Sequence, residues 1–174
     1  MVPITAAPER TEPGYDLGER DLLASYLDYH RATLATKCAG LTAEQLVQRS
    51  VEPSTLSMLG LVRHLAEVER SWFRFCLDGQ PRAPLYYSDA NPDGDFDDTA
   101  VATAAEDVAT WRAECDESRR ILATFESLGD FSRGSRGGGR VAVRWVLAHM
   151  IEEYARHNGH ADLLRQRIDG AVGE

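Results

Sequence analysis

The stretch VRWVLAHMIEEYARHNGHADLL, residues 143–164, decides the fold because its apolar residues recur with the period of a helix. Counting alternately three and four residues from Val143 gives one continuous stripe, typical of a helix packed against other helices. The stripe begins apolar and becomes ionisable: Val143, Val146, Met150, Glu153, His157, His160 and Leu164. A carboxylate and imidazoles that face a core need hydrogen bonds, a counter-ion or a metal. The stretch therefore predicts a long helix that carries a polar site in its packed face.

Three further segments have a helical period and end near a glycine. They cover residues 19–37, 57–77 and 101–127, and the quoted stretch belongs to a fourth helix over 142–168. No segment has a convincing strand pattern, so we predict an all-α fold, a four-helix bundle. We assign residues 1–18 to an extended N-terminal arm, 19–170 to a single domain and 171–174 to a C-terminal tail. The pattern alone leaves the order of the helices in the bundle open, because two of the links are long.

A metal site is predicted where two of these helices face each other. His64 lies on the inner stripe of the 57–77 helix, and Glu153 and His157 lie one turn apart on the last helix. Zinc accepts two imidazoles and one carboxylate, and three protein ligands leave a fourth position for water or substrate. Nickel and iron accept the same set, so the ligands do not select the metal.

Three other histidines lie near the same faces. His160 continues the stripe one turn after His157, and His30 lies on the inner stripe of the 19–37 helix. We interpret both as candidates to support the ligands by hydrogen bonding, with His160 also able to act as a fourth ligand. His149 precedes Glu153 by one turn and could replace it as a ligand. Each of these histidines, taken alone, is also compatible with an ordinary core or boundary position.

Other residues receive plainer interpretations. Glu67 and Glu152 are read as charges facing solvent, and three tryptophans at helical spacing are read as packing residues, namely Trp72, Trp111 and Trp145. Residues 89–94, DANPDG, match the opening of an EF-hand loop, but position twelve is Ala100 instead of glutamate, so an acidic turn is the better interpretation.

A glycine-rich basic loop over residues 131–140 precedes the last helix. No strand precedes its glycines and no G-K-[ST] follows, so they do not form a phosphate-binding loop. Its three arginines could contact an anionic substrate at the rim of the site or could be plain surface residues: Arg133, Arg136 and Arg140.

The composition narrows the range of partners. A net charge of -9 argues against nucleic acid and against an acidic membrane surface. No stretch approaches the roughly 20 apolar residues that a transmembrane helix needs, and a cytosolic protein is expected. The three cysteines are widely spaced and are predicted to be reduced residues of the core or its boundary: Cys38, Cys76 and Cys115.

Two segments carry a family resemblance. LGLVRHLAEVERSWF, residues 59–73, and HMIEEYARHNGHAD, residues 149–162, resemble the two hallmark segments of the DinB/YfiT-like superfamily. The chain is most similar to an actinobacterial branch of uncharacterised proteins, sometimes called mini-circle proteins, and the likeness extends from residues 28–31 to 168–170. The resemblance implies a bundle with up-down-down-up connections and a divalent metal held by His64, Glu153 and His157. Many members have histidine where this chain has Glu153, but the related mycothiol-dependent maleylpyruvate isomerase has glutamate.

The resemblance also implies a class of reaction. Characterised relatives use low-molecular-weight thiols as cosubstrates for S-transfer or isomerisation, so we expect a metal-dependent enzyme that joins a mycothiol-type thiol to a small electrophile. A metal ion would favour the thiolate, and no protein cysteine need be the nucleophile. The alternatives are a non-enzymatic metal- or ligand-binding bundle, perhaps stress-related, and a structural dimerisation module. We expect a monomer or a homodimer.

Overall fold

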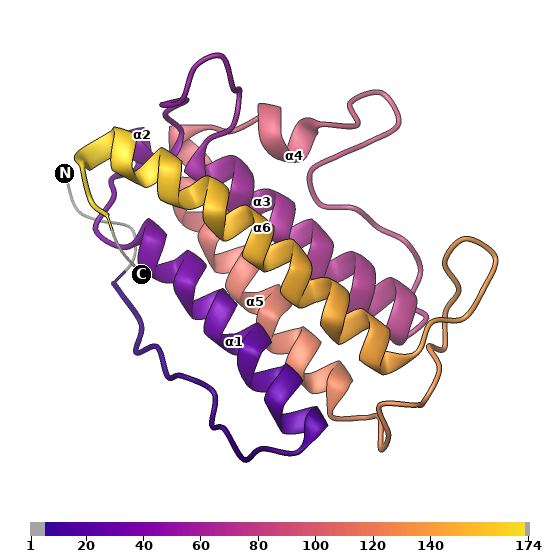
Figure 1. The fold of residues 1–174 in the computed structure, drawn as a ribbon. Helices are drawn as coiled ribbons and strands as arrows, with labels where there is room; N and C mark the ends of the chain where they lie inside the picture. Colours follow the sequence, from indigo (N-terminus) through magenta and orange to yellow (C-terminus); the bar gives the residue numbers. More distant parts are fainter. Residues whose placement is uncertain (1–5, 173–174) are drawn as a thin grey trace.

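A computed structural model describes residues 6–172 of the chain. These residues form helices and loops and contain no β-strand, only isolated bridges, which confirms the predicted all-α class. Four long helical segments lie side by side, and short helices occupy the links between them (Figure 1). The long segments are α1 (Glu19–Cys38), α3 (Met58–Glu69) continued by η1 (Arg70–Leu77), α5 (Ala104–Leu122) and α6 (Val143–Asp169). The short ones are α2 (Ala43–Leu46), α4 (Gly94–Asp97) and η2 (Val101–Thr103).

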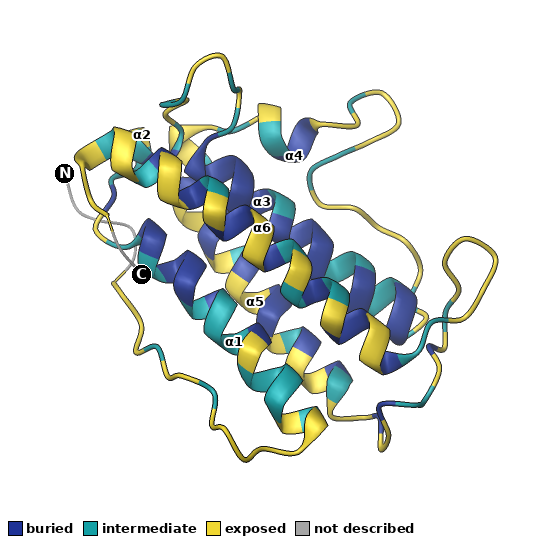
Figure 2. Cartoon of the chain, in the orientation of Figure 1, coloured by how far each residue is buried: buried dark blue, intermediate teal, exposed yellow. Residues whose placement is uncertain are grey.

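The core lies between the apolar faces of the long helices. α1 packs against α6 and α3 packs against α5, while α3 also contacts α6. Figure 2 shows the buried faces of these helices turned toward one another and the exposed faces turned outward. The stripe on α6 follows this division, because Val146 and Met150 are fully buried and Leu164 nearly so. α3, the helix that carries His64, is buried almost throughout.

The predicted helix boundaries are right at α1 and α6 and wrong at α5. We expected a helix over 101–127, but the α-helix ends at Leu122. The chain then turns tightly, with the Thr124 amide and hydroxyl both donating to the Ile121 carbonyl. Phe125 remains buried in the core although it has left the helix. Phe125 thus continues the helical spacing of buried residues from within a turn, so the spacing alone could not show where the helix ends.

The predicted 57–77 helix changes its winding at Glu69. Residues 70–77 form a π-helix, in which the Asp78 amide donates to the Phe73 carbonyl at 2.8 Å. The glycine-rich loop lies against the end of this segment, and the Gly134 amide donates to the Cys76 carbonyl at 3.0 Å. A Cβ atom at Gly134 would lie 2.3 Å from the Phe75 carbonyl oxygen, so this close approach requires glycine. The contact holds the basic loop against the end of η1.

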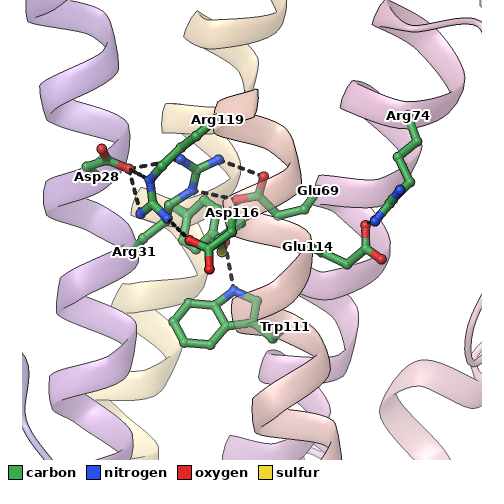
Figure 3. A network of polar contacts seen from close by, with 10 residues as sticks. Asp28, Arg31, Glu69, Arg74, Trp111, Glu114, Asp116 and Arg119 are labelled. Carbon is green, nitrogen blue, oxygen red and sulfur yellow. Dashed lines mark hydrogen bonds and ion pairs between the residues drawn. The ribbon is translucent and has the colours of Figure 1, made fainter. Parts of the chain in front are cut away.

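A buried polar network joins the four long helices (Figure 3). The Arg31 guanidinium donates to both carboxylate oxygens of Glu69 at 2.7 Å each. The Tyr154 hydroxyl donates to Glu69 at 2.8 Å and accepts from the Trp111 indole at 2.8 Å. Burial raises the pKa of Tyr154 well above its usual value, so the hydroxyl keeps the proton that it donates. The network therefore links specific positions of α1, α3, α5 and α6.

The N-terminal arm lies against α1 where the structure describes it. Residues 6–18 form neither helix nor strand, and Arg10 lies over the Tyr29 ring and donates to the Thr33 hydroxyl. The remaining parts of the predicted arm and tail, residues 1–5 and 173–174, lie outside the described residues. None of the helices within residues 6–172 has the length and apolarity needed to cross a membrane.

Candidate metal centre

Three predicted ligands converge between α3 and α6. His64, Glu153 and His157 each offer one ligand atom, and these atoms lie within 4.8 Å of one another. The Nε2 atom of His157 is 3.6 Å from the nearer Glu153 oxygen. Ligands at about 2.0–2.1 Å from a tetrahedral zinc ion lie about 3.3 Å apart, so binding an ion needs only a small closing movement. The donor set suits a divalent metal in both kind and spacing.

A carboxylate on the long loop orients His64. The Nδ1 atom of His64 lies 2.8 Å from an Asp95 oxygen, which leaves Nε2 directed to the ligand group. Asp95 belongs to the short helix α4 and is itself buried, and the ring of its neighbour Phe96 stacks on the His64 ring at 4.4 Å. The sequence did not single out Asp95, because it lies in a segment without a helical period. Residues 89–94, just before it, were interpreted from the sequence as an acidic turn.

His160 lies beside His157 on the side away from Glu153. The Nδ1 atoms of the two rings are 3.4 Å apart, while Nε2 of His157 points to Glu153. The hydrogen bond with His157 lowers the pKa of Glu153, against the opposing effect of burial, so the carboxylate is held in its anionic form. One side chain thus orients each of the two imidazoles, Asp95 for His64 and His160 for His157.

His149 approaches the other oxygen of Glu153. Its Nε2 atom is 3.2 Å from Glu153, and its Nδ1 atom is 3.4 Å from the exposed Glu152. These three residues form a second group with suitable ligand spacing. The His149 ring stacks on Trp145 at 5.0 Å and meets Trp72 edge-on at 4.6 Å. Glu153 therefore lies between two imidazole groups and could be shared by either.

His30 contacts a different part of α6. The Asn158 amide donates to the His30 carbonyl at 3.0 Å, and its nitrogen is 3.5 Å from the His30 ring. Asn158 follows His157 by one residue, which is about 100° around the helix. His30 is therefore separated from the ligand group, in contrast to His160.

A cavity of about 440 Å³ opens beside the ligands. It is lined by His64, Glu153 and His149 on the helices, Asp95 and Phe96 on the long loop, and Arg136 on the basic loop. Of the three candidate rim arginines, Arg136 is the one that reaches this cavity. Arg133 pairs with Asp78, and Arg140 donates to the Ser132 and Phe131 carbonyls, so both hold the loop in place.

Glu67 also lines this cavity, and its burial contradicts the sequence-based prediction. We expected a charge facing solvent, but Glu67 is only 4 % exposed. One of its oxygens accepts hydrogen bonds from the Leu85 and Tyr86 amides at 2.6 Å each, and burial raises its pKa. Its carboxyl group anchors the loop that forms the cavity wall, which explains the burial of an acidic residue one turn after His64.

Replacing Asp95 by alanine is expected to weaken divalent-metal binding about 10- to 100-fold, because His64 loses the partner that fixes its ring. Competition of the protein with a zinc chelator measures the change. Asp97→Ala is the matched control, since Asp97 lies on the same short helix but pairs with Arg49 at the surface. Equal zinc affinity in Asp95→Ala and the wild type would contradict the assigned role.

Comparison with known proteins identifies the family of this chain. A search of curated proteins finds no match to the chain. The family model described as mycothiol-S-transferase matches residues 22–170, a range that runs from the first turn of α1 to the residue after α6 and includes the ligand group. This chain belongs to the mycothiol-S-transferase family.

Proposed function

We propose that this protein is a divalent-metal-dependent enzyme that transfers a mycothiol-type thiol to a small electrophile, by S-transfer or with isomerisation. The observation that carries the proposal is the convergence of His64, Glu153 and His157 within 4.8 Å beside a cavity, in a chain of the mycothiol-S-transferase family. The net charge of -9 supports small molecules over nucleic acid as partners. A cytosolic location is part of the same proposal.

Zinc is the ion that we propose for the site, with nickel and iron as ions that the same donors accept. When bound, it supplies positive charge that favours the thiolate over the thiol at an open coordination position. His64 and His157 would hold it through Nε2 and Glu153 through a carboxylate oxygen. Asp95 and His160 fix the two rings, while the guanidinium of Arg136 gives the rim a positive charge that attracts an anionic substrate.

The cysteines of the chain support the use of an external thiol. Cys38, Cys76 and Cys115 are all free and buried. Burial raises the pKa of Cys38 to about 12 and raises the pKa of Cys76 and of Cys115. Because the thiolate is the nucleophilic form, none of the three is prepared to attack an electrophile.

The proposed transfer forms one carbon–sulfur bond and breaks the bond between the electrophilic carbon and its leaving group. The thiolate sulfur gives an electron pair to the electrophilic carbon, and the leaving group departs with the pair of the broken bond. The thiol proton passes to solvent. In an isomerisation the same carbon–sulfur bond forms and later breaks, and the thiol is regenerated.

The arrangement of the bundle is part of the proposal. We propose that residues 19–170 form one domain with up-down-down-up connections. The directions of the long helices support this order, since α1 and α6 run one way and α3 and α5 run the other (Figure 1). The arrangement puts α3 beside α6, the two helices that carry the ligands.

Turnover with defined thiols tests the function. Protein purified without a nickel column is expected to contain about one divalent ion per chain and to conjugate model electrophiles with mycothiol. Glutathione and free cysteine serve as controls, and a chelator is expected to abolish turnover. If a broad electrophile panel gives no mycothiol-dependent product while the ion is present, the transferase proposal is wrong and the protein is a metal- or ligand-binding bundle.

A further inference from the structure

Three cavities meet at Arg136. Besides the cavity at the ligands, Arg136 lines one of about 570 Å³ and one of about 630 Å³. Its guanidinium lies 4.0 Å from the Trp72 ring centre and donates to the Ser71 hydroxyl at 2.7 Å. Ser71 and Trp72 follow each other in the π-helix, so each side cavity shares a wall with the cavity at the ligands.

The two side cavities differ in chemistry. The cavity of about 570 Å³ is bordered by hydroxyl, amide and guanidinium groups, including Ser71, Gln80, Arg82 and Ser135. The cavity of about 630 Å³ is bordered by Trp72, Trp145, Val141 and Ala142, with two arginines at its edge. A polar thiol and an aromatic electrophile would therefore find separate surfaces in the two side cavities.

Trp145 is exposed to solvent although it contacts two other rings. We read it from the sequence as a packing residue, but it is 49 % exposed on α6. Its ring centre is 5.1 Å from that of Trp72 and 5.0 Å from that of His149. His149 in turn contacts Glu153, so the tryptophan pair connects to the ligand group through one imidazole.

We propose that the cavity bordered by Trp72 and Trp145 is the subsite for the electrophile, and that it selects a flat, aromatic electrophile with an anionic or strongly polar substituent. The exposed Trp145 ring offers a stacking surface beside the buried Trp72, and Arg136 with Arg140 offers positive charge at the edge. This cavity shares Trp72 and Arg136 with the cavity at the ligands, so a molecule bound there would border the space in which the thiol would react. This inference rests on the proposed transferase function for its chemistry, but the binding of a probe tests the subsite separately.

The test uses the full chain and 3-nitrobenzoate, a flat, anionic probe that cannot react with a thiol. Its dissociation constant is measured by calorimetry for the wild type and three variants. Trp145→Ala is expected to raise it about 5- to 10-fold, because stacking on the ring is lost. Trp145→Phe keeps a stacking surface and should stay within about twofold of the wild type. Leu163→Ala, a change at another exposed apolar residue of α6, should leave the constant unaltered.

A kinetic measurement gives the second readout. With mycothiol and 1-chloro-2,4-dinitrobenzene, Trp145→Ala should raise KM for the electrophile by a similar factor and leave KM for the thiol and the metal content unchanged. An unaltered probe affinity in Trp145→Ala, or no binding of the probe to the wild type, would overturn the subsite. If the probe results hold but no thiol-dependent turnover is found, the subsite stands and the proposed function fails.

Discussion

Replacing Glu69 by alanine is expected to lower the free energy of unfolding by about 3–5 kcal/mol, a large part of the stability of a domain of this size. Glu69 is fully buried and Arg31 is 5 % exposed, and the Glu69 carboxylate accepts two hydrogen bonds from Arg31 at 2.7 Å each. The substitution leaves the buried guanidinium of Arg31 with the half-exposed Asp28 as its counter-ion and removes the acceptor of the Tyr154 hydroxyl. Denaturant unfolding followed by circular dichroism measures the loss.

Three further variants separate the possible causes of this loss. Asp116→Ala removes a surface partner of Arg119 and should change stability by about 0.5 kcal/mol or less. Glu69→Gln keeps an acceptor but loses the charge and should fall between the wild type and Glu69→Ala. Replacing Arg31 by methionine together with Glu69 by leucine should recover most of the loss, since no buried charge is then unpaired. A Glu69→Ala protein as stable as Asp116→Ala would show that the network contributes little.

The buried network around Glu69 could not be predicted from the sequence. The spacing of apolar residues predicted four long helices, and the predicted ends of α1 and α6 agree closely with the ends in the structure. Spacing could not reveal that Glu69 faces inward, because a charged residue on a helix is usually exposed and its partner is 38 positions away. Pairing between distant charges depends on how the helices are placed together. The π-helix after Glu69 was missed as well, and its last carbonyls accept hydrogen bonds from a loop more than 50 residues further along the chain, at Arg133 and Gly134.

The candidate site also contains some residues that the sequence predicted and some that it could not predict. His64, Glu153 and His157 could be proposed because unusual residues on a regular stripe are visible in one sequence. Asp95 and Glu67 could not, because one lies in a loop without a period and the other resembles an ordinary surface charge until loop amides cover it. Arg136 was one of three equivalent candidates, and only the path of the loop over Trp72 distinguishes it.

The second large effect is expected at His64. Replacing it by alanine removes one of three ligands, and structural zinc sites with four ligands bind with about 10–16 kcal/mol, or about 3 kcal/mol for each ligand. A loss of that size lowers metal affinity by about two orders of magnitude. Protein purified without a nickel column should then fall from about one ion per chain to a small fraction, and thiol-dependent turnover should fall at least as far.

His30→Ala is the matched control for that experiment. It removes the same side chain from a half-buried position that contacts Asn158 and lies apart from the ligands, so metal content and turnover should stay near those of the wild type. Thermal unfolding adds a readout that does not depend on catalysis. Zinc at 100 times its dissociation constant stabilises a folded protein by about 2.7 kcal/mol, so added zinc should raise Tm in the wild type and His30→Ala. His64→Ala should lack this shift, and full metal content in that variant would exclude the His64, Glu153 and His157 site.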